Sequence, residues 1–246
     1  MQKVALITGA AGGLGQTLAG NLSEAGWQLV VVSRDAERLS QAYGQQHLQI
    51  VADCSTVAGA RHIMAVAKAE QMLPIALAHC VGNIRLGALH RMAEADFMDC
   101  LNANLISAFH TLAAFVGALR EAKLTGSAVF VSSAAARIGT PNHEAVAAAK
   151  GGLEALVRGA AASYASAGIR VNAVAPGIMD TPASAAIIGS ELAREAAARQ
   201  YPLPGIGSTD ELADLMAWLL SAQAARVTGQ VWSMDAGFST IRPLVK

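Results

Sequence analysis

The chain has 246 residues, of which 53% are hydrophobic and 15% charged, and its formal net charge is zero. This length and apolar content exclude a disordered chain and suit one α/β domain with a large core. The balance of 18 basic and 18 acidic residues argues against a nucleic-acid partner and against an anionic membrane surface.

The cysteines and the apolar runs bear on metal binding, cellular location and membrane association. Cys54, Cys80 and Cys100 are too few and too scattered for a disulfide framework or a zinc site, so we expect no metal and a reducing, cytoplasmic location. The N-terminal residues lead straight into a predicted strand, which indicates no signal peptide. No apolar run approaches the roughly 20 residues that span a bilayer, so no membrane association is expected.

Short β-rich runs alternate with longer helical stretches along the whole chain. Strands are predicted at Val4–Thr8, Gln28–Ser33, Leu48–Ala52, Ile75–Cys80, Ala128–Ser132, Arg170–Ala175 and Gln230–Met234. Helices are predicted at Gly13–Ala25, Ala36–Tyr43, Val57–Glu70, Glu94–Ala122, Glu144–Ala167, Pro182–Arg199 and Asp210–Ser221. This alternation predicts the α/β class: a Rossmann-type doubly wound parallel sheet of about seven strands, with helices on both faces. No linker or repeat interrupts it, so residues 1–246 are expected to form a single domain.

A glycine-rich turn follows the first strand and opens the first helix. It contains Gly9, Gly12, Gly13 and Gly15, with Leu14 between the last two. Glycines allow positive φ angles and let a pyrophosphate approach the backbone. The N-terminus of the next helix then offers free N–H groups and a partial positive charge. In this context the turn predicts a dinucleotide site.

The spacing of Gly9, Gly13 and Gly15 is Thr-Gly-x-x-x-Gly-x-Gly, which resembles the short-chain dehydrogenase/reductase (SDR) family. The resemblance extends over the whole chain, through Asp53, Asn104, Ser133, Lys150, Asn172, the segment Pro176–Thr181 and the closing Gln230–Gly237. It implies cofactor contacts from Gly9, Gly12, Gly13, Leu14, Gly15, Ser33, Arg34, Asp53, Cys80, Gly82, Lys150, Pro176, Gly177, Ile178 and Thr181.

The residues after the second strand decide between the two nicotinamide cofactors. Members of the family that use NAD place an acid there, whereas this chain has Ser33 and Arg34. An arginine offers charge-assisted hydrogen bonds to a 2′-phosphate, and Arg38 lies one turn further on. The sequence therefore favours NADP over NAD. The alternative is that Arg34 and Arg38 form a solvated face paired with Asp35 and Glu37.

The resemblance also implies the catalytic residues, with one missing. Ser133 would polarise a substrate carbonyl, Lys150 would bind the nicotinamide ribose, and Asn104 would hold a water in a proton relay. Val146 lies 13 residues after Ser133 and four before Lys150, the two spacings at which the family places its catalytic tyrosine. Valine cannot transfer a proton, so the site lacks its usual acid.

His143 is the residue that we weigh as a replacement. It lies two helical turns before Lys150 and shares a helix face with it, as a tyrosine does in the family's divergent enoyl-reductase branch. A histidine pKa suits acid–base chemistry near neutrality. The alternative is a surface histidine in the first turn of its helix. A second departure is that the family's Asn-Asn-Ala-Gly reads His79-Cys80-Val81-Gly82, which affects hydrogen bonds beside the adenosine.

Two functional hypotheses remain open. One is an NAD(P)-dependent oxidoreductase acting on a carbonyl, alcohol or enoyl substrate. The apolar residues of the stretch Ala183–Pro204, which resembles the family's substrate-covering loop, favour a small apolar substrate. The other is an inactive SDR subunit that binds nucleotide or supports an active paralogue in a hetero-oligomer. The small-residue run Ala145–Ala165 is interpreted as an oligomer interface, and a homo-dimer or homo-tetramer is expected.

Overall fold

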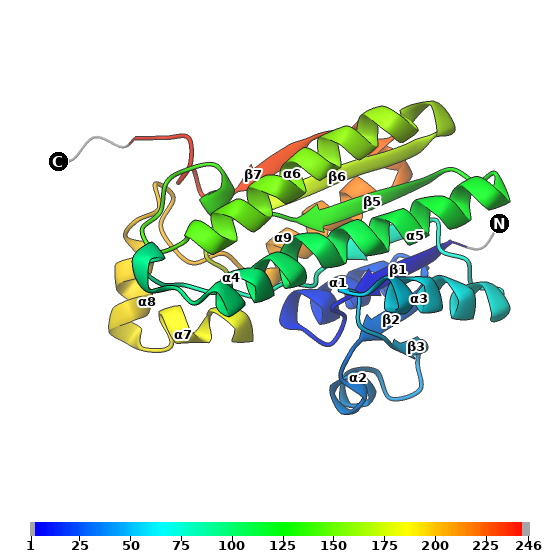
Figure 1. The fold of residues 1–246 in the computed structure, drawn as a ribbon, viewed down its shortest axis with the longest axis horizontal. Coiled ribbons are helices and arrows are strands. Elements are labelled where there is room, and N and C mark those ends of the chain that lie inside the picture. Colours follow the sequence, from blue (N-terminus) through cyan, green and yellow to red (C-terminus); the bar gives the residue numbers. More distant parts are fainter. Residues whose placement is uncertain (1–2, 243–246) are drawn as a thin grey trace.

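The computed structural model describes residues 3–242, and their strands form one sheet (Figure 1). The strands are β1 (Val4–Thr8), β2 (Gln28–Ser33), β3 (Leu48–Val51), β4 (Ala76–His79), β5 (Gly126–Val131), β6 (Ile169–Pro176) and β7 (Val231–Met234). All neighbours pair in parallel, in the order β3-β2-β1-β4-β5-β6-β7. The predicted seven-stranded parallel sheet is therefore confirmed, with strand ends that shift by one or two residues.

Helices cover both faces of this sheet and bury two apolar layers. The helices are α1 (Gly13–Glu24), α2 (Ala36–Tyr43), α3 (Val57–Ala69), α4 (Glu94–Leu101), α5 (Ser107–Ala122), α6 (Glu144–Tyr164), α7 (Ala185–Ile188), α8 (Glu191–Ala198) and α9 (Thr209–Leu220). Helices α3, α5 and α6 pack on one face, and α1, α2 and α9 on the other. Successive strand residues point to opposite faces, so Leu6 joins the first layer and Ile7 the second.

The predicted helix at Glu94–Ala122 is interrupted. A π-helical turn at Asn102–Ile106 separates α4 from α5. The whole stretch is long and apolar enough to cross a bilayer by length and composition, which corrects the expectation that no apolar run approaches this limit. However, its inner face, including Phe115 and Leu119, is fully buried against the sheet, as in the core helix of a globular domain.

The predicted single helix at Pro182–Arg199 is wrong. The segment breaks into a 3-10 turn at Pro182–Ser184, the short helix α7 and the separate helix α8, which begins at its cap Ser190. The hydroxyl of Ser184 folds back on Met179 and Thr181, and Ser190 accepts from the backbone N–H of Ala193. These caps compete with a continuous helix. Figure 1 shows α7 and α8 beside one end of the sheet.

Candidate active site

A cavity of about 490 Å³ lies at the carboxyl ends of the central strands. Its walls include most of the residues predicted for the site: Gly9, Gly12, Gly13, Leu14, Gly15, Cys80, Gly82, Asn104, Ser133, Lys150, Pro176, Gly177, Ile178 and Thr181. Val146 lines the same cavity. Four predicted residues, Ser33, Arg34, Asp53 and His143, are not part of its lining.

The glycine turn has no room for side chains. Gly9 has a φ of +71°, and a Cβ there would lie 2.7 Å from the backbone carbon of Cys80. A Cβ on Gly15 would lie 2.5 Å from the carbonyl oxygen of Gly9. The following helix α1 begins without a side-chain cap and without an acid in its first turn. Its free N–H groups are therefore open to an anion in the cavity.

The side chains after β2 differ in their relation to this turn. The guanidinium of Arg38 reaches back and donates to the carbonyl oxygen of Ala11 at 3.2 Å, so it lies at the cavity wall. Ser33 Oγ accepts from the backbone N–H of Asp35. Asp53 follows β3, and its carboxylate accepts from the N–H and hydroxyl of Ser55, which lowers its pKa. Arg38 is thus the cation at the turn.

Ser133 stands at the end of β5, where it caps a 3-10 turn at Ala134–Ala136. Its Oγ accepts from the backbone N–H of Ala135 at 3.1 Å. That contact uses a lone pair and leaves the hydroxyl proton free to donate to an oxygen in the cavity.

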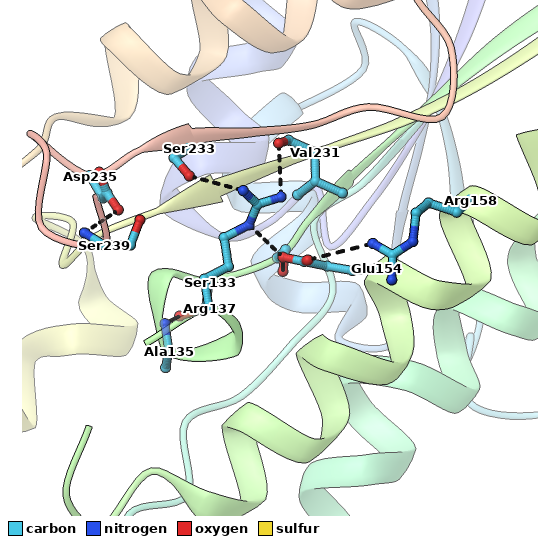
Figure 2. A network of polar contacts seen from close by, with 10 residues as sticks. Ser133, Ala135, Arg137, Glu154, Arg158, Val231, Ser233, Asp235 and Ser239 are labelled. Atoms are coloured by element: carbon cyan, nitrogen blue, oxygen red, sulfur yellow. Dashed lines mark hydrogen bonds and ion pairs between the residues drawn. The ribbon is translucent and has the colours of Figure 1, made fainter. Parts of the chain in front are cut away.

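The loop that carries Ser133 is held by a network that sequence reasoning missed (Figure 2). Glu154 on α6 is buried and accepts from the hydroxyl of Ser132 at 2.9 Å and from Nε of Arg137 at 3.2 Å. The guanidinium of Arg137 also donates to the carbonyl oxygen of Val231 on β7 at 2.9 Å. An Arg and a Glu 17 residues apart carry no signal of such a pairing in the sequence.

Lys150 and Asn104 meet beside Gly82. The Nζ of Lys150 donates to the carbonyl oxygen of Val131 at 2.7 Å, and burial lowers its pKa to about 8. A Cβ on Gly82 would lie 2.6 Å from Oδ1 of Asn104 and 3.4 Å from that Nζ. Only a glycine at position 82 therefore allows the two polar groups to approach.

His143 occupies the N-cap position of α6, with its Nδ1 at 2.8 Å from the carbonyl oxygen of Pro141. The side chain is half-buried. Its role as an acid stays a prediction. Val146, one turn further on, is 5% exposed and packs among Cys100, Ala145 and Ala149.

His79 replaces the first asparagine of the family pattern as a buried bridge. Its Nδ1 lies 2.8 Å from Oγ1 of Thr8 on β1, and its Nε2 lies 3.0 Å from Oγ of Ser107 on α5. Burial lowers the pKa of His79 to about 3, so the ring is neutral in the folded protein. The substitution therefore keeps a polar link between sheet and helix beside the cavity.

This burial makes stability depend on pH. In the unfolded chain the histidine has a pKa near 6.5 and takes up a proton, whereas in the folded protein it stays neutral down to about pH 3. The free energy of unfolding therefore decreases as pH falls from about 6.5 towards 3. We expect a loss of about 1.4 kcal/mol per pH unit in that range from this group. When the free energy of unfolding is measured with urea at successive pH values, its slope against pH should be shallower for His79→Asn. Equal slopes for the two proteins would contradict this assignment.

Comparisons with known proteins agree with this architecture. Residues 9–239 match the family described as enoyl-(acyl carrier protein) reductase. The chain is 31% identical over 241 residues to a 3-oxoacyl-(acyl-carrier-protein) reductase of Pseudomonas aeruginosa, covering 96% of each chain. It is 33% identical over 250 residues to a cis-4-hydroxycyclohexanecarboxylate dehydrogenase of Sinomonas cyclohexanicum, covering 98% of each.

Among solved structures, the fold resembles an actinorhodin polyketide ketoreductase with NADPH, with a TM-score of 0.92, 24% identity and 98% of each chain covered. The chain belongs to the short-chain dehydrogenase/reductase family of oxidoreductases. Within that family it carries valine at position 146.

Proposed function

We propose that the protein is an NADP(H)-dependent oxidoreductase that reduces a carbonyl or enoyl group, or oxidises the corresponding alcohol. The observation that carries this proposal is the single cavity in which the glycine turn, Ser133, Lys150 and Asn104 come together. Related chains with enzyme names and a related fold with NADPH bound support it.

The residues present fit a dinucleotide. The glycine turn lines the cavity with bare backbone, because a Cβ at Gly9 or Gly15 would collide with backbone atoms, and α1 begins there without a side-chain cap. Lys150, whose Nζ has one acceptor, keeps two N–H groups for ribose hydroxyls or water. When bound, the reduced nicotinamide supplies the hydride. Ser133 would then donate its hydroxyl proton as a hydrogen bond to the substrate oxygen.

Arg38 supports NADP over NAD, and its replacement tests that preference. Because a charge-assisted hydrogen bond contributes about 1.5–3 kcal/mol, Arg38→Ala should weaken NADPH binding by about 10- to 100-fold and NADH binding much less. Isothermal titration of the two cofactors measures this. Arg120→Ala is the matched control, because Arg120 is an exposed arginine on α5 that does not line the cavity. Tighter binding of NADH by the unaltered protein would refute the NADP proposal, and no binding of either cofactor would refute the proposed function.

The substrate is proposed to be small and apolar. A second cavity of about 500 Å³ adjoins the first, and the two share Ile84 and Ala183 in their walls. Its other apolar walls come from Leu86, Met92 and Ile187, and its charged residues are Arg85, Arg91 and Asp96. Arg85 is already paired with Asp99 at 2.8 Å. An apolar body next to the reacting group suits such walls.

The second candidate function is an SDR subunit that binds nucleotide without turning over. Val146 favours it, because general acid catalysis contributes about 10²–10⁴-fold and valine cannot supply it. Following NADPH oxidation with ethyl acetoacetate, cyclohexanone and cyclohexenone separates the two candidates. Turnover above background supports the enzyme, and its absence, with NADPH still bound, supports the inactive subunit.

We also propose that the protein self-associates as a homo-dimer or homo-tetramer, or with an active paralogue, in a reducing compartment such as the cytoplasm. Met98 and Phe109 are 44% and 48% exposed on α4 and α5. On α6, a Cβ at Gly151 or Gly159 would meet nothing within 4 Å, which leaves room for close helix packing. The cysteines are all free thiols.

A further inference from the structure

Two side chains of α2 bind successive carbonyl oxygens of the glycine turn. The guanidinium of Arg38 donates to the carbonyl oxygen of Ala11 at 3.2 Å, and the hydroxyl of Tyr43 donates to that of Ala10 at 2.7 Å. Arg38 lines the cavity at the carboxyl ends of the strands, whereas Tyr43 does not and is only 7% exposed. Tyr43 can therefore affect a bound cofactor only through the backbone of the turn.

The phenol oxygen of Tyr43 lies where the two ends of the turn pass each other. It is 2.7 Å from the carbonyl oxygen of Ala10, near the start of the turn, and 3.5 Å from that of Gly15, in the first turn of α1. The same two residues are in close contact, because a Cβ on Gly15 would lie 2.8 Å from the Cα of Ala10. A hydroxyl has one proton, so the short bond to Ala10 is the strong one. Tyr43 thus anchors the start of the turn next to its end.

Burial keeps this hydroxyl fixed and protonated. The ring of Tyr43 belongs to the same buried apolar cluster as Leu18 and Leu39, and its centroid lies 5.6 Å from that of His47 in an edge-on arrangement. Burial also raises the pKa of Tyr43 well above its usual value, so the hydroxyl remains a donor across the neutral range. Movement of the Ala10 carbonyl away from this donor would leave a buried oxygen without its hydrogen bond.

The turn presents the N–H groups of Gly13, Leu14 and Gly15 at the start of α1. These groups precede the first intrahelical bond, which runs from the N–H of Gln16 to the carbonyl oxygen of Gly12. N–H groups at the start of a helix bind phosphate groups. They bind more tightly when they are held in one arrangement beforehand, because less conformational freedom is lost on binding.

Resting on the cofactor-dependent function proposed above, we propose that Tyr43 is a positioning residue for the pyrophosphate of the dinucleotide. Its hydrogen bond to Ala10 holds the glycine turn in the shape that binds a group present in both NADP and NAD. Arg38, on the same helix, lines the cavity itself and serves the 2′-phosphate that only NADP has. Helix α2 thus carries one residue for affinity and another for cofactor preference.

Tyr43→Phe separates these two roles, because it keeps the ring and removes only the hydroxyl. The turn loses a buried hydrogen bond of ordinary strength, so we expect the Kd of NADPH and that of NADH each to rise about 3- to 30-fold. The ratio of the two Kd values should not change, whereas Arg38→Ala should change it. In steady-state kinetics the KM for NADPH should rise with little change in kcat. Tyr164→Phe, half-buried at the end of α6 and outside the cavity lining, is the matched control in isothermal titration and should bind both cofactors normally.

Hydrogen–deuterium exchange tests the cause in the cofactor-free protein. Backbone amides between Gly9 and Gly15 should exchange faster in Tyr43→Phe than in the unaltered protein, whereas those of α5 should not change. If Tyr43→Phe by itself is too unstable to purify, the same comparison is made in a Gly20→Ala background. A Cβ at Gly20 would meet nothing within 4 Å, and alanine stabilises a helix relative to glycine.

Three results would overturn the proposed role of Tyr43. They are unchanged Kd values in Tyr43→Phe, an equal loss of binding in Tyr164→Phe, and a loss confined to NADPH, which would mean that Tyr43 acts through Arg38. If the unaltered protein bound neither cofactor, the proposed function would fail, and the role in cofactor binding with it. The exchange measurement would then still show whether Tyr43 holds the turn.

Discussion

Gly15→Ala is expected to lower the free energy of unfolding by about 1–3 kcal/mol and to weaken NADPH binding at least tenfold. The added Cβ would lie 2.5 Å from the carbonyl oxygen of Gly9 and 2.8 Å from the Cα of Ala10. Both neighbours are backbone atoms, so the turn itself must shift. The shift moves the N–H groups that we expect to bind the pyrophosphate. Urea unfolding and isothermal titration with NADPH measure the two effects.

Gly20→Ala on the same helix is the matched control. A Cβ at Gly20 would meet nothing within 4 Å, and alanine has the higher helix propensity. This variant should gain up to about 1 kcal/mol in the free energy of unfolding and bind NADPH normally. If the two variants behaved alike, the tight packing of the glycine turn would not be what matters for binding.

Arg137→Met should lower the free energy of unfolding by about 2–3 kcal/mol, because it leaves the buried carboxylate of Glu154 without its close cation. The Glu154 side chain is 9% exposed, and the next guanidinium, that of Arg158, lies at 3.8 Å. The Arg137 side chain is 33% exposed, which places the loss below that of a fully buried pair. Figure 2 shows Arg137 joining α6 to β7, so the loop that carries Ser133 should also loosen.

Two further variants test the cause of the lower free energy of unfolding expected for Arg137→Met. Lys68→Met breaks a shorter ion pair, 2.7 Å to Glu121, whose side chains are 63% and 70% exposed. Because solvent screens this pair, its loss should lower the free energy of unfolding much less than Arg137→Met does. The double variant Arg137→Met with Glu154→Leu should recover most of the stability, because it removes the unpaired charge. If Arg137→Met cost no more than Lys68→Met in urea unfolding, the network would not hold this loop.

Local sequence signals were enough for the fold and for most of the site. Apolar runs and the glycines between elements are signals that involve only residues close together in the chain. They therefore predict the seven strands to within two residues at their ends. The glycine turn follows β1 and Ser133 follows β5, and parallel strands bring their carboxyl ends to one edge. Lys150 lies on α6, the helix that comes after β5 in the chain. For this reason the cavity contains them.

The predictions that failed or were missed depend on contacts distant in the sequence. The break between α7 and α8 is the exception, because it follows from local caps at Ser184 and Ser190 that outcompete a continuous helix. The placing of Arg38 requires α2 to lie beside the glycine turn, where Tyr43 also donates to the carbonyl oxygen of Ala10, and no spacing rule describes this contact. The bridge formed by His79 requires Thr8 and Ser107, which lie 71 and 28 residues away in the chain.

The sequence by itself determined the family, the parallel sheet and the absence of a tyrosine at Val146, because each is a matter of residue type at a fixed spacing. Only the tertiary structure decided which polar groups near that valine are left without partners. Asn104 and Lys150 lie on different helices, and their meeting beside Gly82 depends on the π-helical turn and on the end of β4. Hydrogen-bond satisfaction is a property of the packed interior, so no pattern along the chain shows it.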